Sequence, residues 1–369
     1  MNTLQKPSAR RLIQLLRSQG PVSRLKLADL LDVQPSTVTR IVSQLLDDGL
    51  VVEEVDPNRA GRRGYPSKLL QLRPMGLLSA GVFIDPERYY TCIVNALGEV
   101  VSEETSSITD RGFSQLMELI GASVDRQTRQ LGLQPDRFIG CGISYPGQHT
   151  SKPGIVRQTQ YFSEWPEIDA SKDFAPYFDM PVHQLNDAKC ACLAELLFGS
   201  CRSVRNFNYV WLSHGIGGAA VIDQSLYLGK SASAAEFGGL FPKSQPRPSG
   251  SDLLATIKEA GLAADNLEHI SKADLQHESI LNWVDRVEQQ LKWLSLVITR
   301  TMSPDAIVLG GRLPDAIFSE LIERLSASKS LGEDHFGPHP TFIRAEADKK
   351  PHLGAAALPL YLTTSPNAG

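Results

Sequence analysis

Residues 21–50 (PVSRLKLADLLDVQPSTVTRIVSQLLDDGL) constrain the fold more than any other stretch of the chain. Residues 24–31 form one short amphipathic segment, with Ser23 as the expected N-cap, and Pro35 can begin a second helix. In that second helix the residues spaced to lie on one buried face are Val38, Ile41, Val42, Leu45 and Leu46. Two short helices joined by a tight turn predict a helix-turn-helix.

The opposite face of the second helix is polar. Its short hydroxyl, amide and guanidinium groups can donate to phosphates and base edges without carrying a large apolar surface into a DNA groove. We therefore expect DNA contacts from Ser36, Thr37, Thr39, Arg40, Ser43 and Gln44.

A basic hairpin is expected directly after these helices. Residues 50–55 and 67–72 have strand patterns, and the turn between them contains Arg59, Arg62 and Arg63. With a first helix in residues 1–20, these elements predict a winged helix-turn-helix in residues 1–73 that binds double-stranded DNA. An ordinary helical hairpin with a solvated polar face is the alternative, but it leaves the basic turn unexplained.

The charge distribution agrees with DNA contact confined to this head. Residues 1–73 contain 12 Lys and Arg against 7 Asp and Glu, a net charge of +5. The whole chain carries −4, so the remainder carries −9. An acidic body would be repelled by DNA phosphates, whereas the basic head would be attracted.

Cysteine usage and hydropathy favour a cytoplasmic protein. The five cysteines are odd in number and scattered through apolar segments, as expected for reduced core residues. No opening apolar stretch resembles a signal peptide, and no run approaches the length of a membrane span. We expect no membrane partner.

The full chain has 369 residues, which is enough for two or three domains. The pattern of strands and helices after the head predicts an α/β fold. We expect strands at 78–84, 89–94, 100–106 and 137–144, with a helix at 113–131. A second series has strands at 181–184, 209–212, 219–222 and 306–309, with helices at 188–198, within 251–301 and at 354–362. The glycine-rich residues 215–218 are expected to lie between two strands, and no internal repeat is evident.

The chain resembles the ROK family, specifically its winged-helix transcriptional repressors. The resemblance covers nearly the whole chain and rests on ordered motifs: GRRGYPSKLLQL in the wing, GISYPG at 142–147, LNDAKCACLAE at 185–195, GIGGAAVIDQSLYLG at 215–229, AAEFGG at 234–239 and PDAIVLGGRL at 304–313. It implies a two-lobed actin-like ATPase fold with a sugar cleft between the lobes. The first lobe would span 77–190, completed by a C-terminal helix at 350–369, and the second would span 191–349.

The resemblance does not extend to the family's phosphate loop. Kinase members have an acidic-Gly-Gly-Thr type of loop after the first strand, where backbone N–H groups meet nucleotide phosphates. Here that place reads IDPERY, at residues 84–89. Proline offers no N–H, and Glu87 brings negative charge. We therefore expect no enzymatic phosphoryl transfer and no cofactor.

The family's sugar-binding residues are partly present. Asn186 and Asp187 match the pair that contacts sugar hydroxyls, Glu236 matches the sugar-binding glutamate, and Gly147 closes the GISYPG motif. Asn186 or Asp187 could instead be a plain helix N-cap, and both roles can coexist. Glu236 could instead be an exposed loop acid.

The family's zinc motif is missing. After Glu236 the family usually has Gly-His and then a Cys-rich cluster, whereas this chain continues Gly238-Gly239-Leu240 and then FPKSQPRPSGS. No tetrahedral nitrogen and sulfur site can be built from that segment. We expect no bound metal.

These features together predict a cytoplasmic transcriptional regulator, with repression of sugar-related genes as the expected action. It would bind its operator as a homodimer or dimer of dimers, and a carbohydrate or sugar phosphate between the lobes would control it. Two alternatives stay open. One is a ROK sugar kinase with a DNA-binding head, and the other is a regulator that has lost sugar sensing.

Overall fold

The computed structural model describes residues 2–56, 68–109, 112–133, 135–145, 147–150, 152, 154–158, 162–169, 172–328 and 339–368. Its contacts divide the chain into two compact units: unit 1 is Met1–Phe198 with Pro351–Gly369, and unit 2 is Gly199–Lys350. The expected lobe boundary after residue 190 is therefore corrected, because it would cut the continuous helix α5 (Asp187–Leu197). The head of residues 1–73 belongs to unit 1.

The head has the predicted order of three helices and a two-stranded hairpin. Ser23 caps α2, because its Oγ accepts a hydrogen bond from the Lys26 N–H at 3.3 Å. Asp32 ends that helix in a left-handed conformation with φ of 53°, and Pro35 begins the next helix. The elements are α1 (Pro7–Gln19), α2 (Arg24–Leu31), α3 (Pro35–Asp47), β1 (Val51–Val55) and β2 (Lys68–Leu72).

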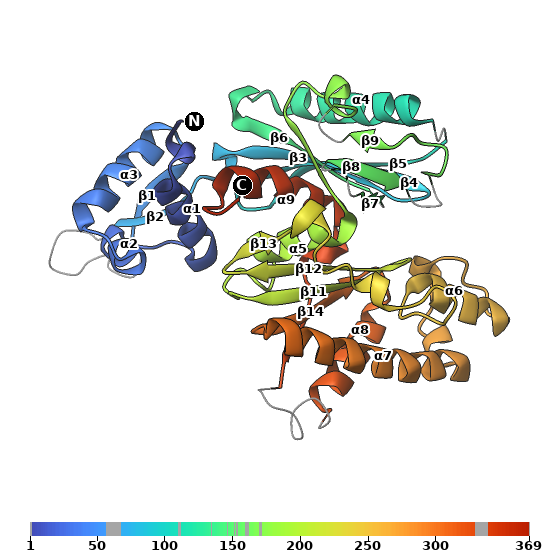
Figure 1. Ribbon diagram of the computed structural model, residues 1–369. Helices are drawn as coiled ribbons and strands as arrows, with labels where there is room; N and C mark the ends of the chain where they lie inside the picture. Colours follow the sequence, from blue (N-terminus) through green and yellow to red (C-terminus); the bar gives the residue numbers. More distant parts are fainter. Residues whose placement is uncertain are drawn as a thin grey trace. The chain divides into compact units, whose positions relative to one another are not determined.

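The body of unit 1 is a five-stranded sheet in the order β10-β6-β3-β4-β5. Helix α4 (Phe113–Leu131) covers one face, and α9 (Pro351–Thr364) covers the other and packs on α5, as Figure 1 shows. The last helix, α9, thus belongs to the same unit as the sheet of β3 to β6. The strands are β3 (Leu78–Ile84), β4 (Arg88–Asn95), β5 (Val100–Ser107), β6 (Phe138–Ser144) and β10 (Val182–Leu185), and a separate small sheet has β7 (Gly147–His149), β8 (Ile155–Gln158) and β9 (Ile168–Asp169).

Glycines allow α9 to approach the sheet and α5 closely. A Cβ atom at Gly142 would lie 1.9 Å from the carbonyl oxygen of Ala355, and one at Gly354 would lie 2.7 Å from the carbonyl carbon of Cys190. A side chain at either position would therefore push the helix off its neighbours. This packing joins α9 to the first turn of α5.

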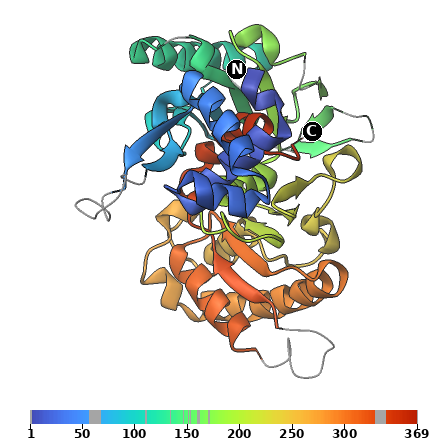
Figure 2. The ribbon, with the colours of Figure 1, turned by 90° about the vertical axis from the view of Figure 1, so that its left-hand side faces the viewer.

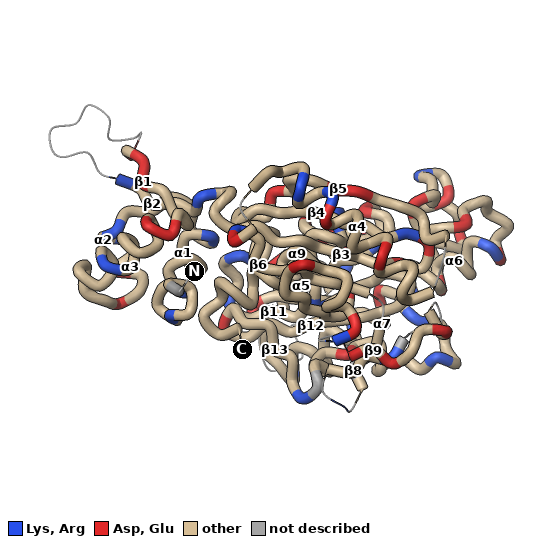
Figure 3. Tube along the Cα trace, turned by 90° about the horizontal axis from the view of Figure 1, so that it is seen from above, with Lys and Arg blue, Asp and Glu red and all other residues tan. Residues whose placement is uncertain are grey.

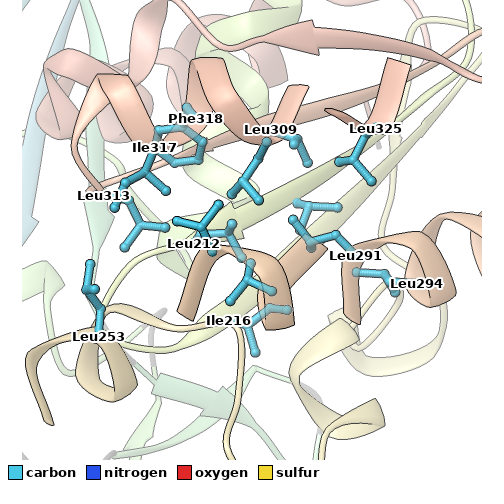
Figure 4. Packing of buried hydrophobic residues seen from close by; sticks show 14 of the residues in the cluster. Leu212, Ile216, Leu253, Leu291, Leu294, Leu309, Leu313, Ile317, Phe318 and Leu325 are labelled. Carbon is cyan, nitrogen blue, oxygen red and sulfur yellow. The ribbon is translucent and has the colours of Figure 1, made fainter. Parts of the chain in front are cut away.

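Unit 2 is built on a second five-stranded sheet, in the order β13-β12-β11-β14-β15. Its apolar core lies between this sheet and α6, α7 and α8; Figure 4 shows Leu212 and Leu309 of the strands packed near Phe318 of α8. Figure 2 shows the α6 to α8 part of this unit in yellow to orange. The elements are β11 (Phe207–Leu212), β12 (Ile216–Ile222), β13 (Ser225–Tyr227), α6 (Gly250–Glu259), α7 (Glu278–Met302), β14 (Ala306–Gly311), α8 (Asp315–Ser326) and β15 (Thr341–Arg344).

The two sheets share one topology. In each, three consecutive antiparallel strands are followed by two strands that run parallel to the first of them. The sequence shows no internal repeat, so this repeat is structural. It agrees with the expected two-lobed α/β fold.

Of the glycine-rich residues 215–218, only Gly215 lies in the turn between β11 and β12, which corrects the prediction for the other three. Ile216, Gly217 and Gly218 belong to β12 and pair with Leu212, Trp211 and Val210 of β11. Ladder hydrogen bonds outweigh the low strand propensity of glycine here.

No helix in the described part of the chain is long and apolar enough to cross a bilayer.

Candidate functional site

Helix α3 separates an apolar face from a polar face, as predicted. Its buried side chains are Val38, Ile41, Val42 and Leu45. Leu46 is only half-buried, because it lies at the edge of the apolar stripe. Among the residues expected to contact DNA, the exposed ones are Ser36, Thr39, Arg40 and Ser43, and the half-buried ones are Thr37 and Gln44.

Two side chains of this polar face have partners inside the head. Thr39 Oγ1 donates to the carbonyl of Pro35 at 3.0 Å, and Gln44 Oε1 accepts from Lys6 Nζ at 3.1 Å. Arg40 is exposed and presents a planar set of donors that suits a guanine edge. Arg40 is therefore the best candidate on α3 for reading a base.

The hairpin β1–β2 follows α3 in antiparallel register, from Val51 opposite Leu72 to Val55 opposite Lys68. An ion pair of 2.6 Å between Arg24 and Glu53 ties α2 to β1. The expected wing arginines, Arg59, Arg62 and Arg63, lie outside the described residues. Figure 3 shows basic positions on α2 and α3 and acidic positions at β1.

We expect Ser23→Ala to loosen α2, because it removes the acceptor for the Lys26 N–H. Loss of such a cap costs about 1 kcal/mol, or about fivefold in local opening. Hydrogen exchange of the α2 amides in the full chain measures it. Ser18→Ala in α1, where the hydroxyl only donates to the Leu15 carbonyl, is the matched control. Equal exchange in both variants would contradict the cap.

Three arginines join the head to the rest of unit 1. Arg137 Nη1 donates to the carbonyls of Asp48, at the end of α3, and Gly76, at 2.9 and 3.3 Å. Arg17 Nη2 donates to Thr364 Oγ1 at 3.1 Å, and Arg10 Nη1 approaches the Ser365 carbonyl at 3.4 Å, both at the end of α9. Burial lowers the pKa of Arg17 to about 10, so it stays charged at neutral pH. Cations at a helix C-terminus are favoured by its dipole.

The pair Asn186-Asp187 begins α5 at the carboxyl end of β10. Asn186 is the N-cap, since its Oδ1 accepts from the Lys189 N–H at 3.0 Å, and it is 7% exposed. Asp187 is half-buried, and its Oδ1 accepts from the Ala188 N–H at 2.9 Å. The capping interpretation of Asn186 is thus confirmed, and it leaves room for a ligand role, because an amide also has two donors.

Gly147 lies in β7, in the small sheet of the same unit. A Cβ atom there would lie 2.6 Å from Val156 Cγ1 and 3.0 Å from Tyr145 Cε2. Close packing therefore requires glycine at this position, whether or not a ligand approaches it.

Gln184 and Tyr145 were not predicted as site residues. Their side-chain polar atoms are buried without a hydrogen-bond partner among the described residues, at the carboxyl ends of β10 and β6. A glutamine in the short strand VHQL, two residues before the Asn186-Asp187 pair, was the available signal.

The backbone N–H groups of the loop after β3 form hydrogen bonds within the loop itself. Asp85 Oδ1 accepts from the N–H groups of Glu87 and Arg88 at 2.9 and 2.6 Å, and the Asp85 N–H donates to the Arg88 carbonyl at 2.9 Å. These are the backbone N–H groups that a phosphate-binding loop would direct at its ligand. An aspartate carboxylate of the chain itself takes them instead.

In the corresponding turn of unit 2, after β11, the chain's own carbonyl groups also take up nearby backbone N–H groups. The N–H groups of Gly250 and Ser251, at the start of α6, donate to the carbonyls of Ser213 and His214 at 2.6 and 3.2 Å. First-turn amides of a helix are a common anion site, and here the turn itself uses them.

Glu236 belongs to unit 2, in a turn after β13, and it is exposed. Among the described residues, no group of three or more His, Cys, Asp or Glu could hold a metal ion. The segment after Glu236 instead directs a guanidinium at the turn, since Arg247 Nη2 donates to the Gly238 carbonyl at 2.7 Å. A cationic donor is the opposite of a metal ligand, so these residues do not fit zinc.

Both the head and the body of the chain are similar to known protein families. Residues 81–360 match the model of the ROK family, and residues 10–58 match that of the iron dependent repressor, N-terminal DNA binding domain. An uncharacterized protein of Sinorhizobium fredii, y4fQ, is 31% identical over 355 residues, covering 95% of this chain and 90% of that protein.

A xylose repressor of Caldicellulosiruptor bescii is 26% identical over 219 residues, which cover 59% of this chain and 54% of the repressor. A solved structure of a ROK family transcriptional regulator, described as a homolog of the Escherichia coli MLC protein, superposes with a TM-score of 0.73 and covers 96% of both chains. At 21% sequence identity this likeness concerns the fold.

Proposed function

The chain belongs to the ROK family, and we propose that it is a DNA-binding transcriptional regulator that represses sugar-related genes in the cytoplasm. The observation that carries the proposal is the exposed polar face of α3, on a helix held by a capped α2 and followed by a β hairpin. The match of residues 10–58 to a repressor DNA-binding domain supports it.

In this proposal residues 1–73 bind the operator. Ser36, Thr37, Thr39, Arg40, Ser43 and Gln44 enter the major groove, while Arg59, Arg62 and Arg63 contact the phosphate backbone. A homodimer places two heads on two half-sites, about one helical turn apart or a multiple of it. A dimer of dimers would use the same geometry twice.

The proposed effector is a carbohydrate or sugar phosphate. Asn186, Asp187, Glu236 and Gly147 would bind it, with carboxylate and amide groups accepting and donating hydrogen bonds to hydroxyls. The similarity to a xylose repressor favours an aldose. The effector would act by binding the DNA-competent and DNA-incompetent conformations with different affinities.

The alternative of a sugar kinase with a DNA-binding head is less well supported. Phosphoryl transfer depends on positioned N–H donors and a metal at the phosphates. In this chain Asp85 takes the N–H groups of the first loop, and Ser213 and His214 take those at the start of α6.

We expect the purified chain to release no ADP from ATP and Mg²⁺ when D-xylose or D-glucose is added. A coupled ADP assay measures this, with Asp187→Asn as the matched control for a catalytic carboxylate. Sugar-dependent ADP release that disappears in Asp187→Asn would contradict the regulator-only proposal and favour the kinase.

A regulator without sugar sensing is the second alternative, and the absence of His and Cys from residues 237–251 favours it over a family-typical sugar site. A thermal-shift screen of sugars and sugar phosphates separates the two. Selection of DNA from a random duplex library by the full chain tests the DNA-binding proposal itself. An enriched motif with two-fold symmetry supports it, and recovery of unenriched DNA would contradict it.

A further inference from the structure

The turn that carries Glu236 depends on support from outside itself. Ala235 has φ of 57°, a left-handed conformation that a residue with a Cβ atom rarely adopts. Within the turn, the Phe237 N–H donates to the Ala235 carbonyl at 2.8 Å, and the Gly239 N–H donates to the Glu236 carbonyl at 3.0 Å. Strained backbone of this kind persists only where its surroundings hold it.

Strand β12 supports one side of this turn. A Cβ atom at Gly218 would lie 2.3 Å from the Phe237 ring and 2.6 Å from the Ala235 carbonyl oxygen. A Cβ atom at Gly238 would lie 2.3 Å from the Ile216 carbonyl oxygen. The turn thus rests directly on backbone, and the buried Phe237 anchors it there.

Arg247 supports the turn through the Gly238 carbonyl. Its Nη2 donates there at 2.7 Å, a charge-assisted hydrogen bond that is stronger than one between neutral groups. The segment around Arg247 is itself fixed. The Ser249 N–H donates to the Arg247 carbonyl at 2.8 Å, and Gln290 Nε2 of α7 donates to the Pro246 carbonyl at 2.8 Å.

We propose that Arg247 is the positioning residue for Glu236, holding the turn of residues 235–240 by a hydrogen bond where a metal centre does not fit. Residues 237–251 contain no His or Cys, and the guanidinium of Arg247 supplies a cationic donor to the turn from this segment. The proposal deepens the proposed function, because it rests on Glu236 as an effector contact. Arg247 acts through the backbone of the turn and does not itself contact the effector.

Hydrogen exchange of the ligand-free full chain tests the positioning role directly. In Arg247→Met the Gly239 and Phe241 amides should exchange about tenfold faster or more, because a hydrogen bond to a charged group is removed. Arg247→Lys, which keeps one charged donor, should restore part of the protection. Lys243→Met is the matched control, since it removes an exposed cation from the same segment. Unchanged exchange in Arg247→Met, or one zinc per chain by elemental analysis, would overturn the proposal.

Calorimetric titration with D-xylose and D-glucose, together with operator binding, separates this proposal from the assignment of Glu236. Arg247→Met should weaken binding of whichever sugar the wild type binds and leave sugar-free operator affinity unchanged. If Glu236→Gln binds that sugar normally while Arg247→Met still loosens the turn, Glu236 is not an effector contact but the positioning role stands. If Glu236→Gln weakens sugar binding and Arg247→Met changes neither exchange nor binding, the positioning role is wrong.

Discussion

Replacing Arg40 with alanine should weaken operator binding by about 1–3 kcal/mol and relax the base preference at one position of each half-site. Arg40 is exposed on the polar face of α3, whose opposite face is anchored by buried Val38 and Ile41. The side chain can therefore be removed without disturbing the core. Fluorescence anisotropy with the selected duplex and with single-base variants of it measures both effects.

The control is Arg11→Ala, which removes an exposed arginine of the same head from α1. It should change affinity little and base preference not at all. The combined change Arg62→Ala and Arg63→Ala should instead weaken binding to all sequences alike, and it should reduce the salt slope by about 1 for each phosphate that the wing no longer neutralises. Wild-type binding in both the Arg40 and the wing variants would remove the head from consideration as the DNA reader.

Asp187→Ala and Glu236→Ala should each weaken sugar binding by about 1–3 kcal/mol. The sugar concentration needed to change operator occupancy should therefore rise about 5- to 150-fold. Each change leaves a hydrogen-bonding group of the bound sugar without its partner. Operator affinity without sugar should stay near the wild-type value, because neither residue belongs to the head. Titration of D-xylose and D-glucose against a labelled operator measures the shift.

Glu118→Ala, which removes an exposed carboxylate of α4, is the control for the change in negative charge. The expected pattern follows from linkage: an effector shifts the DNA equilibrium only through its unequal affinity for two conformations, so weaker sugar binding demands more sugar. If both site variants respond at wild-type sugar concentrations, the assignment of Asp187 and Glu236 is wrong.

Local patterns in the sequence were enough to predict most elements of the fold. The strand at 78–84 and the helix at 113–131 agree with β3 and α4 residue for residue, because the strand is a continuous, mostly apolar run and the helix has an amphipathic period. Some exceptions depend on partners elsewhere in the chain. Gly217 and Gly218 have the composition of a loop, yet ladder pairing with β11 makes them strand, and the short strand β15 pairs with β14. Helix α8 was also not predicted, although its buried residues have helical spacing.

The polar face of α3 and the N-cap role of Asn186 could be predicted, since both follow from short-range spacing. The contacts that join the head to α9 and that hold the turn of Glu236 could not be predicted. Arg17 meets Thr364 across 347 residues of sequence, and Arg247 meets a carbonyl group that any residue would offer. Neither contact leaves a pattern in a single sequence.

We propose that this one chain reads DNA with its head and is controlled by a carbohydrate bound to its body. Binding of the full chain to the selected duplex and to a scrambled duplex of equal length, at about 150 mM salt with and without each sugar, tests it most directly. We predict at least about a thousandfold preference for the selected duplex, as for other specific DNA-binding proteins, and loss of that binding with one class of sugar. Equal affinity for the two duplexes would contradict the claim.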